Sequence, residues 1–215
     1  MKIGIIGSGQ VGQVLAKAFI AEGHVVTLGT RNHLKVEVVK FKNENNAVAI
    51  ANFADTAKFG ELIVLATNGE ATLEIVKGID ASNFKNKIII DATNPIAKTA
   101  PVNGVLQFFT GPNESLMEKI QQLLSEARLV KAFNSVGSGL MYKPVFKGGP
   151  PTMFIAGNDE NAKDTVRDIL THFGWETEDM GKAEAARAIE PLCILWCLPG
   201  FTKNQWSHAF KLLKV

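Results

Sequence analysis

A strand, a glycine-rich turn and a helix follow one another at the start of the chain. Residues 3–6 are apolar, residues 7–12 read GSGQVG with the spacing GxGxxG, and residues 11–22 have a helical pattern that ends at Gly23. In such a unit Gly7 permits a tight turn, Gly9 lets the backbone approach a pyrophosphate, and Gly12 lets the helix pack closely on the strand. The start of the helix also attracts phosphate through its free N–H groups and its dipole. The pattern therefore favours dinucleotide binding over a plain glycine-rich turn.

The rest of the chain continues this alternation of short strands and helices. Apolar runs predict strands at 24–28, 47–50, 62–66, 87–91 and 129–133, with helices over 34–42, 71–76 and 114–127, the last of them capped by Asn113. Such alternation is typical of βαβ units and a parallel sheet. We therefore predict an α/β protein with a Rossmann-type, doubly wound and mostly parallel sheet.

A glycine- and proline-rich stretch from Gly137 to Pro151 interrupts the alternation. Beyond it we expect a strand at 153–156, a helix at 161–172, a strand at 176–179 and helices from about Glu184 onward. Pro191 and Pro199 are expected to kink or break these last helices. The predicted organisation is a dinucleotide-binding domain over residues 1–150 and a small C-terminal α/β appendage over 151–215, which packs on it and ends in helices.

The end of the second predicted strand bears on which dinucleotide binds. NAD sites usually have Asp or Glu about 20 residues beyond the glycine pattern, where it binds the ribose hydroxyls. Here the sequence is Thr30-Arg31-Asn32, without a carboxylate. The Arg31 guanidinium could bind a 2′-phosphate through two hydrogen bonds, and Lys35 could add a second charge. Arg31 and Lys35 could also be solvated surface bases, but the missing acid favours NADP.

Polar residues at the later strand ends should line the same crevice, because ligands in open α/β sheets bind beyond the carboxyl ends of the strands. Their amides and hydroxyls could bind a nicotinamide carboxamide, although such side chains equally often form turns and helix caps. The predicted cofactor-binding residues are Gly7, Ser8, Gly9, Gln10, Val11, Gly12, Thr30, Arg31, Asn32, Lys35, Ala66, Thr67, Asn68, Thr93, Asn94 and Asn134.

The sequence lacks a recognisable acid–base pair. None of the four histidines has an acidic partner at a suitable spacing. Cys193 and Cys197 share a helical face without a further ligand, so they are interpreted as core residues. We assign no catalytic residue and predict no metal site.

Composition excludes several classes of partner. The 215 residues include 23 Lys and Arg against 21 Asp and Glu, a net charge of +2, which gives no broad basic surface for nucleic acid. No apolar run reaches the 18 residues of a membrane span, and glycines interrupt the apolar N-terminus where a signal peptide would be continuous. Two cysteines fit a reducing compartment, so we predict the cytoplasm. The apolar residues 192–201 form either a core helix or the seam of a homodimer.

Several segments together resemble a known family. They are the GxGxxG unit, Gly29-Thr30-Arg31 with Lys35 beyond it, and residues 91–95 (DATNP), 130–134 (VKAFN), 154–158 (FIAGN) and 186–192 (ARAIEPL). The chain resembles the coenzyme F420-dependent NADP oxidoreductases, which move hydride between NADPH and a deazaflavin, over essentially its whole length. The resemblance implies a 2′-phosphate site at Thr30, Arg31 and Lys35. The segment around Phe133-Asn134 is also similar to the NADPH-binding domain of STEAP-type ferrireductases.

The functional hypothesis is an NADP(H)-dependent oxidoreductase that passes hydride to a small-molecule redox acceptor, a flavin or a deazaflavin. Its catalysis would consist mainly of positioning, because such a ring takes up charge itself. The alternatives are an NADPH-dependent imine or keto-acid reductase and a non-catalytic NADPH-binding sensor. We expect residues 135–151 to wall the acceptor site with apolar side chains, including Met141 and Tyr142, unless these side chains pack the sheet instead.

Overall fold

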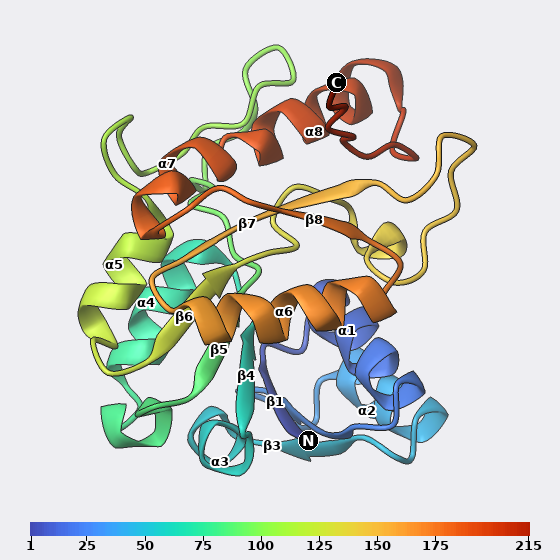
Figure 1. The fold of residues 1–215 in the computed structure, drawn as a ribbon. Helices are drawn as coiled ribbons and strands as arrows, with labels where there is room; N and C mark the ends of the chain where they lie inside the picture. Colours follow the sequence, from blue (N-terminus) through green and yellow to red (C-terminus); the bar gives the residue numbers. More distant parts are fainter.

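Eight strands form one sheet in the computed structural model, which describes residues 1–215 (Figure 1). The spatial order is β3-β2-β1-β4-β5-β6-β7-β8. Strands β1 to β6 are parallel, β7 is antiparallel to β6, and β8 is parallel to β7. Their bounds are β1 (Lys2–Ile6), β2 (Val25–Gly29), β3 (Ala49–Ala51), β4 (Leu62–Leu65), β5 (Ile88–Asp91), β6 (Arg128–Lys131), β7 (Thr152–Gly157) and β8 (Glu176–Asp179). The predicted α/β class and the mostly parallel sheet are confirmed.

Helices cover both faces of the sheet (Figure 1). On one face lie α1 (Gln10–Ala21), α2 (Val36–Glu44) and α6 (Glu160–His172), whose apolar side chains share one core with the strands. On the other face lie α3 (Phe53–Phe59), α4 (Gly69–Lys77) and α5 (Leu116–Leu123), which share a second core. Because both faces are covered, the central strands are continuously apolar; β4, for example, is buried at all its positions.

The last helices lie at the end of the molecule where the parallel strands finish, at the top of Figure 1. They are α7 (Ala186–Ile189) and α8 (Leu192–Lys203). A Cβ on Gly137, in the loop after β6, would lie 2.5 Å from the Trp196 ring of α8, so α8 packs directly on this loop. The long loop between β5 and α5 reaches the C-terminal end of α8, where Gly104 lies against Phe201 and Thr202.

The predicted helices differ from the structure in their bounds, by one or two residues at α1, α2, α4 and α6 and by more at α5 and at the end of the chain. The predicted helix over 114–127 begins instead at Leu116, capped by Ser115 rather than Asn113, and ends at Leu123. The Ser115 Oγ accepts the Glu118 N–H at 3.1 Å and donates to the Glu118 carboxylate at 2.7 Å, which fixes the start of α5. The helical end predicted for the chain is wrong beyond Lys203, because Asn204 adopts φ 53° and residues 204–215 form no helix.

Helix α3 was not predicted from the sequence. It is only seven residues long, with Asn52 as its cap, which accepts the Asp55 N–H at 2.8 Å. Its buried residues are Thr56 and Ala57, so no long apolar face reveals it. The missed element matters because α3 contributes to the candidate site.

Residues 151–215 continue the sheet of residues 1–150. β7 is hydrogen-bonded to β6 with Val130 opposite Gly157 and Lys131 opposite Ala156. The tail returns to the same strand, where the Thr152 N–H donates to the Phe210 carbonyl at 2.9 Å. The division at residue 150 stays a prediction, and it falls within a continuous sheet.

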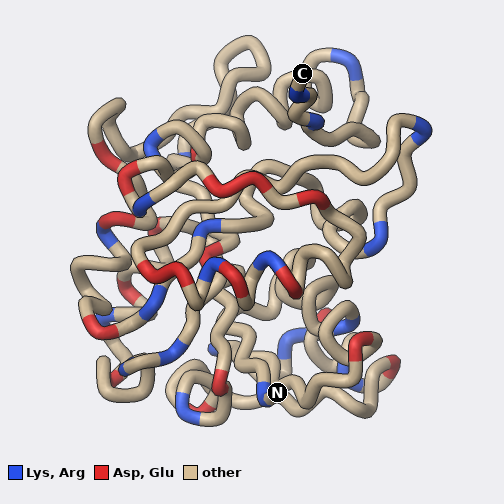
Figure 2. The backbone as a smooth tube through the Cα atoms, in the orientation of Figure 1, with Lys and Arg blue, Asp and Glu red and all other residues tan.

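Positions of Lys and Arg alternate with positions of Asp and Glu along the backbone (Figure 2). None of the helices is both long and apolar enough to cross a membrane.

Candidate functional site

The three glycines of the turn after β1 differ in what surrounds them. Gly7 has φ 125°, and a Cβ there would lie 2.4 Å from the Ala66 carbonyl oxygen. A Cβ on Gly12 would lie 1.9 Å from the Gly7 oxygen, whereas one on Gly9 would meet nothing within 4 Å. Gly7 and Gly12 are thus required by the fold. Gly9 instead borders open space, which is what a backbone approached by a ligand requires.

The start of α1 offers unpaired backbone donors beside this space. The first helical hydrogen bond runs from Gln13 N–H to the Gly9 oxygen at 3.0 Å, so the N–H groups of residues 10–12 have no helical partner. The Gln13 side chain donates to the Ser8 carbonyl at 3.0 Å, and the Ser8 hydroxyl donates to Thr30 at 2.9 Å. These bonds fix the turn against the end of β2. The geometry is that of an anion site at a helix start.

A cavity of about 410 Å³ opens at this turn and contains most of the predicted cofactor residues. Two bases, Arg31 and Lys35, line the cavity together with no acidic residue, so its electrostatics favour an anion. A second cavity of about 860 Å³ adjoins it, and its wall includes Glu70, Glu74 and Lys98. The residues common to both cavities are Arg31, Phe53, Asn68, Ala71 and Ile75. The lining residues of the first cavity are Gly7, Ser8, Gly9, Thr30, Arg31, Asn32, Lys35, Phe53, Ala66, Thr67, Asn68, Ala71 and Ile75.

Phe53, Ala71 and Ile75 were not predicted from the sequence. Phe53 belongs to α3, which has no sequence signal of its own, and Ala71 and Ile75 belong to α4. The strand–helix alternation alone could have placed a helix between β3 and β4, but not a specific side chain facing the cavity.

At the end of β4, the side chains of Thr67 and Asn68 form a turn and a helix cap, as the alternative to ligand binding predicts. The Asn68 Oδ1 accepts the Glu70 N–H at 3.2 Å and so caps α4. The Thr67 hydroxyl is 2.6 Å from that of Thr72. Both side chains therefore serve the local turn while their residues line the cavity.

Thr93, Asn94 and Asn134 form a separate group at the ends of β5 and β6. The Asn94 Nδ2 donates to the Asn134 carbonyl at 2.8 Å, and the Asn134 Nδ2 donates to the Asn94 Oδ1 at 3.2 Å. The Asn134 Oδ1 is buried and has no hydrogen-bond partner. None of the three lines the cavity at the glycine turn. Asn94 and Asn134 are thus hydrogen-bonded to one another and lie outside the cavity at the glycine turn.

The backbone conformation of Phe133, the residue before Asn134, is unusual. It adopts φ 64°, a left-handed conformation that is rare for a large side chain. Its ring is buried and lies 6.0 Å from that of Phe173, so the core holds the conformation in place. Such held strain often occurs at functional sites.

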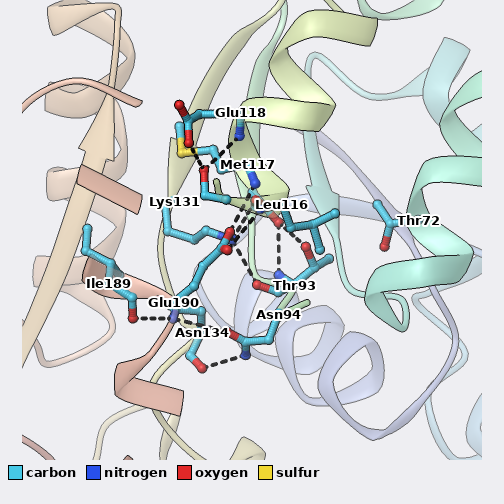
Figure 3. A network of polar contacts seen from close by, with 12 residues as sticks. Thr72, Thr93, Asn94, Leu116, Met117, Glu118, Lys131, Asn134, Ile189 and Glu190 are labelled. Carbon is cyan, nitrogen blue, oxygen red and sulfur yellow. Dashed lines mark hydrogen bonds and ion pairs between the residues drawn. The ribbon is translucent and has the colours of Figure 1, made fainter. Parts of the chain in front are cut away.

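A buried ion triad lies beside the asparagine pair (Figure 3). The Lys131 ammonium is 2.8 Å from the Asp91 carboxylate and 2.8 Å from the Glu190 carboxylate, with Lys131 and Asp91 fully buried. Burial alone would lower the pKa of Lys131, but the two carboxylates outweigh it and hold this pKa above its usual value. Glu190 also accepts the N–H groups of Leu116 and Met117 at 2.9 and 3.0 Å, at the start of α5. The members of this network are far apart in the chain, so no local sequence pattern indicates it.

The prediction that residues 135–151 wall the acceptor site with apolar side chains is wrong for Met141 and Tyr142. Both pack against the core between α1 and α6, and the Tyr142 hydroxyl donates to Glu22 at 2.7 Å. These two side chains therefore pack the sheet, which was the alternative to lining an acceptor site. The segment next to Asn134 is covered by Trp196 of α8 instead.

Comparisons with known proteins agree with this geometry. Residues 2–95 match the family described as NADP oxidoreductase, coenzyme F420-dependent. The F420-dependent NADP reductase of Methanocaldococcus jannaschii is 29% identical, over 91% of this chain and 90% of that protein. A crystal structure from an Arthrobacter species, provisionally named an F420-dependent NADP reductase, is 31% identical over the full length of both chains with a TM-score of 0.93. The chain belongs to the F420-dependent NADP oxidoreductase family.

Membership in the F420-dependent NADP oxidoreductase family makes the chain an NADP-dependent oxidoreductase. This confirms the resemblance stated from the sequence, the enzyme class and the choice of NADP. The likeness to STEAP proteins is also present, because the metalloreductase STEAP3 of Rattus norvegicus is 28% identical over 92% of this chain. The chain spans 38% of the length of that protein.

Proposed function

We propose that the protein transfers hydride between NADPH and a flavin or deazaflavin ring. The observation that carries the proposal is the cavity at the glycine turn, which Arg31 and Lys35 line together with Gly9, next to the unpaired N–H groups at the start of α1. NADPH, when bound, supplies the hydride from its nicotinamide ring. The residues of this chain bind it, orient it and keep water away.

The cofactor residues fit a dinucleotide with a 2′-phosphate. The N–H groups of Gln10, Val11 and Gly12 would donate to the pyrophosphate beside Gly9. Arg31 would hold the 2′-phosphate through two charge-assisted hydrogen bonds, with Lys35 as a second positive charge. The absence of an acidic side chain from this cavity removes the repulsion that a carboxylate would impose on that phosphate.

The asparagine pair suits the nicotinamide end. Asn94 is partly exposed beside the buried Asn134, whose Oδ1 lacks a hydrogen-bond donor, and a carboxamide NH₂ is a donor of the kind that this atom lacks. Asn94 would fix the same amide plane through its bonds to Asn134. Thr93 offers no free group to the ligand, because its N–H and its buried hydroxyl donate to Asp91 at 2.9 and 2.6 Å and its carbonyl accepts from Lys131, so its part is to hold the backbone before Asn94.

The choice of acceptor rests on the name of the methanogen relative and on the side chains at the strand ends. Asp91, Lys131 and Glu190 lie close to Asn94 and Asn134, and all three are buried and joined in ion pairs. A keto acid or an imine usually needs a proton donor at this place. A flavin or deazaflavin ring does not, because it delocalises the charge itself.

Titration of the dinucleotides tests the cofactor part of the proposal. Wild type should bind NADP much more tightly than NAD, and Arg31→Ala should lose about 1.5–3 kcal/mol of NADP binding, roughly 10- to 150-fold in Kd. NAD binding should change little. Lys40→Ala, which removes an exposed base of α2 that does not line the cavity, is the matched control. Equal wild-type affinity for the two dinucleotides would contradict the NADP assignment.

Stopped-flow oxidation of NADPH tests the acceptor part. Coenzyme F420, a free flavin, a panel of small keto acids and a panel of cyclic imines are compared at equal concentration. We expect rapid oxidation with a flavin or with F420 only. Fast turnover of a keto acid or an imine without a flavin response would favour the metabolite-reductase alternative, and NADPH binding without turnover of any acceptor would favour the sensor.

A further inference from the structure

A closed ring of hydrogen bonds and ion pairs joins the asparagine pair to the buried triad (Figure 3). It runs from Lys131 to the backbone before Asn94, through Asn94 to Asn134, then to the C-terminal segment and back to Lys131. The ring includes parts of β5, β6 and α7, which are separated by up to a hundred residues of sequence. No other part of the candidate site depends on such distant segments.

On the β5 side the triad immobilises the residue before Asn94. The Asp91 Oδ1 accepts both the Thr93 N–H at 2.9 Å and the Thr93 hydroxyl at 2.6 Å. The Lys131 ammonium donates to the Thr93 carbonyl at 2.9 Å. All three polar groups of Thr93 are therefore held by the triad. The backbone that carries Asn94 cannot shift unless Asp91 or Lys131 shifts as well.

On the other side the triad immobilises the segment that holds Asn134. The Asn134 Nδ2 donates to the Ile189 carbonyl at 3.0 Å, and the next residue is Glu190. Glu190 is 1% exposed and is bound by Lys131 and by two N–H groups of α5. These contacts also fix the orientation of the Asn134 amide, because its NH₂ donates to two oxygens.

We infer that Asp91, Lys131 and Glu190 are positioning residues, which hold Asn94 and Asn134 in the geometry that binds the nicotinamide end of NADPH. The inference rests on the proposed function. Burial serves this role, because a fully desolvated ion triad has few alternative arrangements. The glycine turn with Arg31 lies outside the ring, so the triad should act on one end of the cofactor only.

The test compares two ligands that share one end. 2′,5′-ADP carries the adenosine and the 2′-phosphate of NADP but no nicotinamide, whereas NADPH carries both ends. Both are titrated against wild type and against Glu190→Gln, which keeps the size of the side chain and removes its charge. We expect the Kd of NADPH to rise about fivefold or more relative to that of 2′,5′-ADP. Hydride transfer to the acceptor should slow by about tenfold or more, because misplaced rings react poorly.

A second variant addresses the risk that a lone substitution leaves a buried charge unpaired. The combined variant Asp91→Asn, Lys131→Met and Glu190→Gln removes all three charges together, which a protein core tolerates better than a broken pair. Thermal unfolding identifies variants that retain the fold. The matched control is Asp179→Asn, which neutralises the partner of another buried lysine, Lys163, at 2.7 Å. This control should leave both Kd values and the hydride-transfer rate unchanged.

Each outcome has a distinct meaning. An unchanged Kd ratio and rate in a folded variant, or an equal rise of both Kd values, would overturn the positioning role. Loss of the fold in both variants would assign the triad to stability alone and would also overturn it. Failure of wild type to bind either ligand would instead show that the proposed function is wrong.

Discussion

At the scale of single residues, Gly7, Gly9 and Gly12 have different structural roles in the turn after β1. The sequence pattern predicts all three tasks because they follow from local backbone geometry. The pairing of Asn94 with Asn134 and the contact of Glu190 with Lys131 could not be predicted in this way. Their partners are 40 and 59 residues apart in sequence and meet only when the sheet has formed. The local sequence pattern thus predicts the glycine turn of the candidate site, whereas the asparagine pair depends on tertiary contacts.

The glycines also yield a residue-scale prediction. Gly9→Ala should leave stability near that of wild type, because the new Cβ meets no protein atom and φ is −74°. The same methyl group enters the space proposed for the pyrophosphate, so the Kd of NADP should rise about tenfold or more. Gly12→Ala should instead destabilise the protein by about 1–3 kcal/mol, because its Cβ would lie 1.9 Å from the Gly7 oxygen. Calorimetric titration and urea unfolding measure the two effects. Wild-type NADP affinity in folded Gly9→Ala would contradict the proposed pyrophosphate position.

At the scale of elements, long helices with one apolar face were predictable and short capped ones were not. Helix α6 agrees with its prediction within one residue, because it carries a regular apolar stripe. Helix α5 begins two residues later than expected. Its Ser115–Glu118 capping box competes with Asn113 for the start, and the contact of Glu118 with Arg187 is not visible from sequence. α5 therefore depends on the C-terminal segment for its first turn.

This dependence predicts a pH effect on stability. The hydrogen bond from Arg187 lowers the pKa of Glu118 below its usual 4.5. A group with a lowered pKa in the folded state stabilises the protein above its unfolded pKa, and this stabilisation is lost as pH falls through the folded pKa. Arg187→Met should therefore lower Tm by about 1–3 °C at pH 7, with a difference that shrinks as pH falls below about 4.5. Thermal unfolding between pH 3 and pH 7 measures it, with Lys203→Met as the control for loss of an exposed positive charge outside the Glu118 contact. A difference that is constant over this range would exclude the Glu118 contact as its cause.

At the scale of the whole molecule, the C-terminal residues complete the structure begun by the N-terminal ones. One core contains Phe19 of α1 and Phe173 beyond α6, whose ring centroids are 5.1 Å apart. Glu190 closes the start of α5, and β7 covers the edge of β6. The glycine- and proline-rich stretch before β7 resembles a linker in composition, which is why the sequence favours a boundary there. Composition does not reveal that the next strand pairs with the previous one.

The continuous sheet predicts how the protein unfolds. Because the core of α1 and α6 spans residue 150, we expect a single cooperative transition, with coincident midpoints by far-UV and near-UV circular dichroism. Trp175, 4% exposed in this core, provides the near-UV signal for packing across the proposed boundary. A fragment of residues 1–150 should fail to fold, because it would expose the apolar side chains that α6 and β7 cover. The full chain at the same concentration is the control. Two separated transitions, or a fragment that unfolds cooperatively, would show instead that the first 150 residues form an independent domain.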